Sequence, residues 1–548
     1  MKQRLITGAA LGSLVGLPYL AIVYAGQQIA RLPLVPVDLF EWITRLLPGR
    51  VVTLGLEGMI NLLHALQLGP TSILGKAAEF ALAYLVTLLS LAGFGALYGA
   101  TFERLKVSWP VRGVLTGFVL AVLASLLANW GGWGKSGPVI GAGWILITTL
   151  GWGLVLAWSI DRVLPTLAGE QDAGRRRALG QLTLGSLALT ALAIGLGRWL
   201  GQRDQPLPIV QEISTPTPTA PPPTPPPTQA GFSLIPGTRP EITPIDDFYR
   251  VDINLLPPGQ EDLAEAADNL TKRLLAQGGE TDLPAASYVL EIGGLVNQSL
   301  TLDLAAIRAF PQVEQYATLA CISNPVGGDL ISTTLFQGIR LKDVLARAGL
   351  QAAAVDIRFT CVDGYTESLP VESALDPRTL LCYAMGNHPL SQEHGAPIRL
   401  YTPDRFGMKN PKWIIKIEAV AEDYHGYWEQ RGWSEQAWVQ TTSVIDTLQT
   451  DGSHRTQVGG IAFAGARGIE RVELRVDSDE WLPAEVNRPL SPLTWVLWRA
   501  ILDIPPGEHE VTVRAVDEQG EVQTVERSGA HPDGATGLHS ESILIPLP

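Results

Sequence analysis

The chain has 548 residues, of which 46% are hydrophobic and only 17% are charged. This length allows three or four domains, and such an apolar composition predicts a membrane portion. Residues 1–205 hold 16 basic and 9 acidic side chains (net +7), whereas residues 206–548 hold 24 and 45 (net −21). The acidic second part excludes nucleic acid as an expected partner, because phosphate binding needs a basic face.

The N-terminal third contains five apolar runs, each about as long as the roughly 20 residues that a bilayer-spanning helix needs. They are residues 5–29, 77–100, 111–130, 138–160 and 179–200. The stretch 51–68 is interrupted by Glu57 and His64, which favours an interfacial or re-entrant helix, with a sixth span as the alternative. We therefore expect a membrane domain of about five transmembrane helices over residues 1–203.

Basic residues gather before the first run and in the loops 101–112 and 161–177. By the positive-inside rule, the N-terminus is cytoplasmic and residues after about 203 lie outside a plasma membrane that the chain crosses several times. The run Arg175–Arg177 precedes the last apolar segment. It is either ordinary positive-inside charge or a twin-arginine export signal.

Residues 206–227 contain ten prolines among small polar residues, a composition typical of an extended spacer. We assign residues 204–230 to a linker. The segment 260–283, which lies beyond it, is charged and helical in pattern, and we interpret it as a surface insertion.

Mixed strand and helix patterns over residues 231–436 predict an α+β domain. Residues 288–296 and 413–420 alternate like strands, and a strand leads into a short helix over 300–310. The amphipathic stretch 341–348 predicts a helix that ends at Gly349.

The patterning changes in residues 437–548, where β-rich runs are separated by Gly, Pro and Asp turns. No helical pattern lies between these runs. The segment is therefore predicted to form an all-β sandwich of immunoglobulin type.

Cys321 lies in QYATLACISNPVGG, residues 315–328, at the end of a predicted strand and before a turn. Pro325 ends the strand, and the two glycines allow a close backbone approach. A free cysteine of this kind is either core filling or a soft ligand for a transition metal. The other cysteines, Cys361 and Cys382, leave an odd total of three, which argues against a disulfide framework.

A basic cluster lies in EHGAPIRLYTPDRFGMKNPKW, residues 393–413 of an otherwise acidic domain. Its cationic or titratable members are His394, Arg399, Arg405, Lys409 and Lys412. A basic loop of this kind is either solvated surface or a site for a phosphate-bearing cofactor, for which arginine suits bidentate contact.

Five motifs taken in order resemble one family. They are TLACISNPVGG, FQGIRLKDVLARAG, CVDGYTESLP, HGAPIRL and GMKNPKW. Together they resemble the molybdopterin-binding domain of the sulfite oxidase family. Residues 437–548 are similar to that family's immunoglobulin-like dimerisation domain, so the resemblance covers roughly residues 240–548.

The resemblance implies a molybdenum–molybdopterin cofactor with Cys321 as the thiolate ligand of the metal. His394 and Arg399 match residues that contact the pterin and its phosphate. Asn410, Pro411 and Lys412 match the segment that binds the phosphate end.

Three further residues are expected near the metal. Arg250 falls where family members have an arginine beside the metal pocket. Asp363 and Tyr365 lie in a motif close to that pocket, and Tyr365 is assigned to the catalytic group with Arg250 and Cys321.

The chain also departs from the sulfite-oxidising pattern. Pro325 and Val326 occupy the end of a stretch that reads Gly-Asn-Arg-Arg in those members, and Trp433 stands near the place of their active-site tyrosine. After Arg250, the family's Asn-His is replaced by Val251 and Asp252. A weakened basic pocket argues against sulfite and leaves a sulfoxide-type reductase open.

The predicted function is a membrane-anchored extracytoplasmic molybdenum oxidoreductase that performs two-electron redox or oxygen-atom transfer on a small molecule. No CxxCH heme motif occurs, so we expect a separate electron carrier: a cytochrome, a quinone or a membrane partner. The resemblance implies a homodimer through the C-terminal domain. The alternative is a non-catalytic, membrane-tethered binding or scaffold module that retains the fold.

Overall fold

The computed structural model describes residues 2–30, 32–66, 71–101, 107–131, 137–163, 172–201, 232–254, 288–450 and 455–546. The chain divides into two compact units. One comprises Met1–Leu47 and Lys76–Thr217, and the other comprises Pro48–Gly75 and Pro218–Pro548. The predicted proline-rich linker and the predicted insertion at 260–283 lie outside the described residues.

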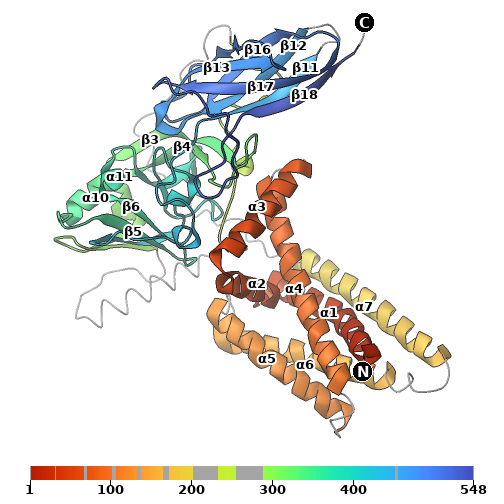
Figure 1. Ribbon diagram of the computed structural model, residues 1–548. Helices are drawn as coiled ribbons and strands as arrows, with labels where there is room; N and C mark the ends of the chain where they lie inside the picture. Colours follow the sequence, from red (N-terminus) through yellow and green to blue (C-terminus); the bar gives the residue numbers. More distant parts are fainter. Residues whose placement is uncertain are drawn as a thin grey trace. The chain divides into compact units, whose positions relative to one another are not determined.

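The N-terminal part is helical (Figure 1). Its helices are α1 (Lys2–Ala30), α2 (Val35–Leu46), α3 (Gly49–Leu66), α4 (Thr71–Thr101), α5 (Trp109–Gly131), α6 (Gly137–Val163) and α7 (Asp172–Gly201). In the described residues, five segments are long and apolar enough to cross a membrane: Gln3–Ala30, Leu74–Thr101, Trp109–Ala128, Pro138–Val163 and Leu179–Leu200. They coincide with the five predicted runs. The described part of the weaker stretch 51–68 lies in α3, which ends at Leu66, and its interfacial position stays a prediction.

Glycines allow two pairs of helices in the first unit to approach closely. A Cβ atom built on Gly153 of α6 would lie 2.4 Å from the carbonyl oxygen of Gly113 on α5. One built on Gly8 of α1 would lie 2.2 Å from the carbonyl oxygen of Gly95 on α4. Small residues at such crossings are typical of membrane helices, which pack by close backbone contact.

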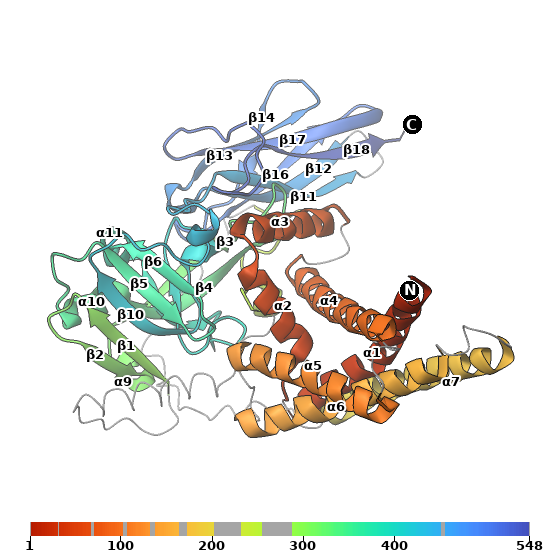
Figure 2. The same ribbon diagram turned by 60° about the horizontal axis from the view of Figure 1, so that its bottom comes forward.

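Two sheets form the α+β part of the second unit. The first has the order β2-β1-β10-β5-β6, and these strands lie side by side in Figure 2. Its strands are β1 (Val289–Gly294), β2 (Leu300–Asp303), β5 (Asp356–Cys361), β6 (Thr366–Pro370) and β10 (Ile414–Val420). The pair β1 and β10 is parallel, and the other pairs in this sheet are antiparallel.

The second sheet has the order β3-β4-β7-β8, with β9 also paired to β7. Its strands are β3 (Gln312–Ala320), β4 (Ile331–Arg340), β7 (Leu380–Met385), β8 (His388–Pro389) and β9 (Arg399–Tyr401). The short helices of this part are η3 (Ile245–Asp247), α9 (Leu304–Arg308), α10 (Leu341–Ala348), α11 (Val371–Leu375), η4 (Gly407–Lys409) and η5 (Glu429–Arg431).

Local predictions in the α+β part are confirmed. The strand patterns at 288–296 and 413–420 form β1 and β10, and residues 300–310 contain β2 and α9. Helix α10 ends at Gly349, whose φ of +71° is the left-handed cap that favours glycine. Leu345 of α10 packs in one hydrophobic core with Phe359 and Ile417 of the first sheet and Leu381 of the second.

The C-terminal part contains two four-stranded sheets, ordered β11-β12-β16-β15 and β14-β13-β17-β18. The strands are β11 (Thr442–Thr450), β12 (Arg455–Phe463), β13 (Ile469–Val476), β14 (Leu482–Pro483), β15 (Glu485–Val486), β16 (Val496–Asp503), β17 (Gly507–Asp517) and β18 (His539–Ile545), with the short helix η6 (Gly465–Arg467). Val458 and Trp498 of one sheet share a core with Leu474 and Val513 of the other. The immunoglobulin type stays a prediction.

Candidate active site

One cavity of the second unit is lined by eight of the nine residues that the sequence assigned to the site. We call it the Cys321 cavity, and these eight are Cys321, Asp363, Tyr365, His394, Arg399, Asn410, Pro411 and Lys412. They come from the end of β3, the start of β6 and the segment around β9 and η4. The fold therefore brings together motifs that lie up to 91 residues apart in the sequence.

Cys321 follows the last residue of β3, as the sequence predicted. Its backbone N–H donates to the carbonyl of Leu330 at 2.9 Å, which ties the cysteine to the neighbouring chain. The turn after it includes Gly327, whose φ is +80°. The strand end is thus a rigid mount, and the thiol is presented to the cavity on a short, hydrogen-bonded turn.

The thiol of Cys321 lies 3.0 Å from the hydroxyl oxygen of Ser323. Burial raises the pKa of this thiol, while hydrogen bonds from Ser323 and Ile322 act in the opposite direction. A bound metal cation favours the thiolate, because the positive charge offsets the cost of burying the anion.

Arg399 is a buried cation on β9. Its Nη1 donates to the carbonyl of His394 at 3.2 Å. Its Nε atom is buried without a hydrogen-bond partner in the described part of the chain. Because a buried donor on a charged group is costly to leave unpaired, this guanidinium fits an anionic or strongly accepting ligand.

His394 precedes the turn at Gly395 and is neutral near pH 7. Burial, together with the positive charges of Arg399 and Lys412, lowers its pKa to about 4. Its Nε2 lies 3.2 Å from the carbonyl oxygen of Ile245. Since a carbonyl only accepts, Nε2 carries the ring proton and Nδ1 is left as an acceptor.

Lys412 lies beside His394 and Arg399, held there by the backbone of Gly395. With its φ of +105°, Gly395 is so close that a Cβ atom would lie 3.0 Å from the Lys412 side chain and 3.1 Å from that of Arg399. The Lys412 ammonium pairs with Asp252 and donates to the carbonyl of Glu393 at 3.2 Å. Burial lowers its pKa.

Arg250 is the one predicted site residue that is not part of the cavity wall, although its neighbours Tyr249 and Val251 are. Its guanidinium pairs with Asp252 and lies 3.1 Å from the carboxylate of Glu393. Asp252, which replaces a family histidine, therefore joins Arg250 and Lys412 in one ionic group. The catalytic role assigned to Arg250 stays a prediction.

Asn410 and Pro411 contribute to the wall mainly as a frame. The Asn410 side chain accepts from the backbone of Thr402 at 2.6 Å and donates to the carbonyl of Phe406 at 3.0 Å. The carbonyl of Pro411 accepts from Leu400 at 2.9 Å. These bonds fix the loop that carries Lys412.

Asp363 and Tyr365 stand on the turn before β6. The Asp363 carboxylate accepts from the backbone N–H of Tyr365 at 3.0 Å, and burial raises its pKa to about 6. The Tyr365 hydroxyl lies 2.9 Å from the Glu367 carboxylate and 2.7 Å from the carbonyl of Met408, and it can donate to either.

Two members of the predicted basic cluster have other partners. Lys409 forms buried ion pairs with Glu367 and Glu429. Arg405 stacks on the Trp438 ring at 3.3 Å and donates to Ser373 at 3.1 Å. Neither belongs to the cavity wall, so Arg399 and Lys412 are the arginine and lysine of the cluster that line the cavity.

Several wall residues were absent from the predicted set. The aromatic ones among them are Phe248, Tyr249, Trp413, Trp428 and Trp433. Phe248 and Tyr249 stack with ring centroids 5.7 Å apart. The sequence marks Trp433 only as the residue near the place of the family's active-site tyrosine. Tyr249 and Trp413 are signalled only by adjoining the predicted residues Arg250 and Lys412.

A thiol, buried cations and an unpaired guanidinium donor around one cavity fit an anionic, phosphate-bearing cofactor whose metal takes a soft ligand. These features are those expected of a molybdopterin-binding oxidoreductase. Residues 278–428 match the family described as oxidoreductase molybdopterin binding domain.

Individual proteins are similar to the chain. It is 31% identical over 144 residues to the uncharacterized oxidoreductase YuiH of Bacillus subtilis (strain 168), covering 26% of this chain and 71% of that protein. It is 29% identical over 296 residues to mitochondrial sulfite oxidase of Macaca fascicularis, covering 44% of this chain and 54% of that protein. It is 26% identical over 348 residues to sulfite oxidase of Arabidopsis thaliana, covering 52% of this chain and 82% of that protein.

The chain belongs to the sulfite oxidase family of molybdopterin-dependent oxidoreductases. These matches identify its second part as an oxidoreductase domain of the kind that binds the molybdenum cofactor. The chain spans about half the length of the mammalian relatives that it matches.

Proposed function

We propose that this protein is a membrane-anchored, extracytoplasmic molybdenum oxidoreductase that performs two-electron redox or oxygen-atom transfer on a small substrate. The observation that carries the proposal is the position of the Cys321 thiol in the same cavity as Arg399 and Lys412. When bound, the cofactor supplies a metal that exchanges two electrons.

Each site residue has a separate task in this proposal. The Cys321 sulfur is the protein's ligand to molybdenum. Arg399, through its Nε atom, and Lys412 hold anionic parts of the cofactor. His394 is neutral, so it positions the pterin by hydrogen bonding without adding charge.

A substrate less anionic than sulfite is favoured. Pro325 and Val326 follow Cys321 where the sulfite-oxidising pattern has arginines. In the wall near the cysteine, Ser323, Trp428 and Trp433 present a hydroxyl and two aromatic side chains. A neutral, polarised group such as a sulfoxide suits such a wall, because transferring a doubly charged oxyanion there costs more desolvation energy.

Sidedness and export are part of the proposal. The basic residues of the 101–112 and 161–177 loops support a cytoplasmic N-terminus. A domain that folds around its cofactor before crossing the membrane favours the twin-arginine interpretation of Arg175–Arg177. A reporter fused after Pro548 is expected to be active only outside the cytoplasm, and Arg175→Lys with Arg176→Lys is expected to leave residues 231–548 inside.

Two partners are proposed. The absence of a CxxCH motif from the sequence supports a separate electron carrier, either a cytochrome, a quinone or a membrane protein. The β-rich segment 437–548, by its resemblance, supports a homodimer. Size measurement of the detergent-solubilised protein tests the dimer, and a monomer would contradict it.

The ligand assignment is tested on the full-length protein from a host that makes the cofactor. Cys321→Ser is expected to lower dye-linked turnover by at least about a hundredfold, because its hydroxyl is a poor soft ligand. Cys382→Ser is the matched control, since Cys382 is also a buried free cysteine but is not part of the cavity wall. Unchanged turnover in Cys321→Ser would contradict the assignment.

The alternative function is a non-catalytic, membrane-tethered scaffold that retains the fold. The replaced arginines favour it, since function belongs to a site and not to a fold. Elemental analysis separates the two, because wild-type protein without molybdenum would support the scaffold. The unpaired Nε atom of Arg399 opposes the scaffold, as a disused site has no need of that buried donor.

A further inference from the structure

A buried group of three ionised side chains lies behind Tyr365. Lys409 of η4 donates to the carboxylate of Glu367 at 2.7 Å and to the carbonyl of Ser368 at 3.1 Å, and it also pairs with Glu429. The Glu367, Lys409 and Glu429 side chains are 0%, 2% and 2% exposed. We call these three residues the Lys409 triad.

The Lys409 triad has one more negative than positive charge. Two carboxylates and one ammonium leave a net charge of −1, and excess charge is costly in a buried site. The triad can therefore bind one further proton. Consistent with this, burial is the largest cause that raises the pKa of Glu367 to about 7, against the opposing effect of Lys409. The titratable groups facing Glu367 are Lys409, Glu429, Tyr365 and Cys361.

On one side, the triad reaches the Cys321 cavity. The free oxygen of the Glu367 carboxylate, Oε2, lies 2.9 Å from the Tyr365 hydroxyl. Tyr365 is part of the cavity wall. A proton on Glu367 is thus one hydrogen bond away from a residue of the cavity wall.

On the other side, the triad reaches solvent. Glu429 accepts from the backbone N–H of Gly426 at 2.6 Å, and its Oε2 lies 3.7 Å from Nδ1 of His425. The His425 side chain is 56% exposed. The segment is held in place by a bond of 2.7 Å from Gln430 to the carbonyl of His425.

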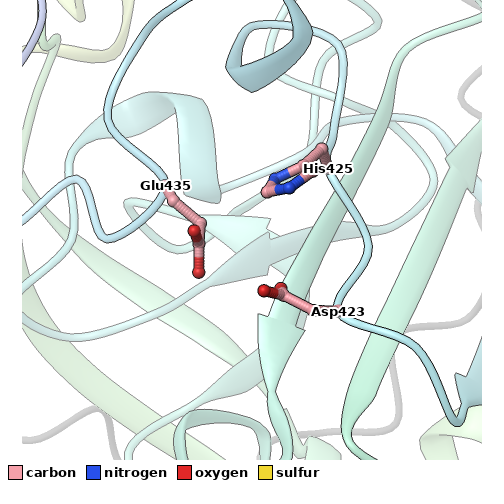
Figure 3. Close-up of side chains that lie close together, drawn as sticks. All are labelled: Asp423, His425 and Glu435. Atoms are coloured by element: carbon pink, nitrogen blue, oxygen red, sulfur yellow. The ribbon is translucent and has the colours of Figure 1, made fainter.

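The surface end contains two more proton-binding groups. Figure 3 shows Asp423, His425 and Glu435 turned toward one another, and their ligand atoms lie within 4.8 Å of each other. All three are exposed. Carboxylates around an exposed imidazole concentrate cations, protons included, at that point of the surface.

We propose that His425, Glu429, Lys409, Glu367 and Tyr365 form a proton path between solvent and the Cys321 cavity. The path rests on the proposed function, because oxygen-atom transfer moves protons as well as electrons. In the reductive direction, a substrate oxide takes two electrons from the separate carrier and two protons from the path, and leaves as the reduced product and water. In the oxidative direction, water supplies the oxygen, two protons leave by the path and two electrons go to the carrier.

Each transfer returns the groups to their initial state. For release, the Tyr365 hydroxyl gives its proton to Glu367 and accepts one from the cavity. Lys409 then takes a proton from Glu367 while it gives one to Glu429, and His425 carries that proton to solvent. Uptake is the reverse, after the Tyr365 hydroxyl has rotated toward the cavity. From Tyr365 to Glu429 this role uses proton donors and acceptors in direct contact, as general acid–base chemistry requires, and the 3.7 Å step from Glu429 to His425 closes by a small movement of the exposed imidazole.

A purely structural role for the triad is the competing explanation. It is distinguished by film voltammetry of the full-length, cofactor-loaded protein in detergent, which gives the rate of the proton-coupled redox step separately from the equilibrium potential. Glu429→Gln is expected to slow that step by about a hundredfold, within the range of positioned acid–base groups, with molybdenum content unchanged. His425→Gln is expected to slow it by about tenfold.

Chemical rescue and a matched control sharpen the test. Imidazole in the buffer is expected to restore the rate of His425→Gln, which a structural defect would not permit. His388→Gln is the control, because His388 is an exposed histidine on β8 and outside the path. If Glu429→Gln does not fold, His425→Gln tests the path by itself, since His425 is exposed and its substitution should not disturb folding. Wild-type rates in the folded path variants would overturn the proposal.

A second readout needs no turnover. Infrared difference spectra of the cofactor-free protein are expected to show a buried carboxyl that titrates near neutral pH and is lost in Glu367→Gln. Absence of that band in the wild-type spectrum overturns the proton path, even if protein from a cofactor-producing host contains molybdenum. Absence of molybdenum with the band present overturns the proposed function, so the two failures are distinguishable.

Discussion

Replacing Lys409 by methionine removes the only cation of the Lys409 triad and leaves the Glu367 and Glu429 carboxylates facing each other in a buried site. Breaking a buried pair by removing one partner costs about 3–5 kcal/mol, because the remaining charge is uncompensated. We expect a loss of this size at neutral pH. For a folding unit of this size it lowers the midpoint of thermal unfolding by roughly 5–10 °C.

The loss in Lys409→Met depends on pH in a direction set by Glu367. The folded-state pKa of Glu367 is about 7, above its ordinary 4.5, so its contribution to stability is present below pH 4.5 and is lost as pH rises through about 7. At 1.4 kcal/mol per pH unit, this change amounts to about 3 kcal/mol in wild type. The Lys409 ammonium lowers this pKa, so removing Lys409 raises it further. The variant therefore keeps losing stability at pH values where the wild type no longer does, and its deficit must grow as pH rises through and above about 7.

Thermal unfolding of the full-length protein in detergent measures this deficit at several pH values. Lys416→Met is the matched control, because Lys416 is 26% exposed and its pair with Glu418 at 2.6 Å lies at the surface. Exposed pairs contribute about 1 kcal/mol or less. The double variant Lys409→Met with Glu367→Gln should recover part of the loss. A deficit no larger than that of Lys416→Met, or one that shrinks toward neutral pH, would refute the reasoning.

Three further predictions concern the site and the membrane helices. His394 should titrate with a pKa of about 4 in NMR spectra, so its contribution to stability is present above pH 6.5 and is lost as pH falls through about 4; a pKa near 6.5 would contradict its burial. Gly395→Ala should lower the free energy of unfolding by about 1–2 kcal/mol, because φ is +105° and the new Cβ meets Lys412. The molybdenum content of this variant should also fall. Full molybdenum content together with wild-type stability would contradict this prediction. Gly153→Leu should separate α5 from α6 and lower the thermal stability of the first unit, whereas Gly151→Leu, with open space around it, should not.

Local patterns predicted the elements that depend on short stretches of sequence. Apolar length predicted the five candidate spans, since a membrane helix must satisfy its backbone internally over about 20 residues. The amphipathic period and Gly349 predicted α10 and its end, because only a left-handed residue without a Cβ penalty closes that turn at low cost. Pro325 predicted that Cys321 ends a strand.

Charge partners were not predictable in the same way. Lys409 lies in one basic stretch with Arg399 and Lys412, which predicts that all three belong to one cluster. In the structure Lys409 turns to Glu367, 42 residues away, and Glu429, 20 residues away. Which cation faces a cavity and which is neutralised depends on how β6, η4 and η5 pack, and a one-dimensional pattern contains no information on that packing.

The family, the cofactor and the strand-end position of Cys321 could be inferred from residues alone, because they depend on ordered motifs and local turn chemistry. The shared cavity wall of eight assigned residues, the pairing of Arg250 with Asp252 and Glu393, and the burial of Lys409 between two carboxylates became visible in the folded chain. Burial and the distance between charges set pKa values and ion pairing. Both arise when strands far apart in sequence, such as β1 and β10, lie next to each other.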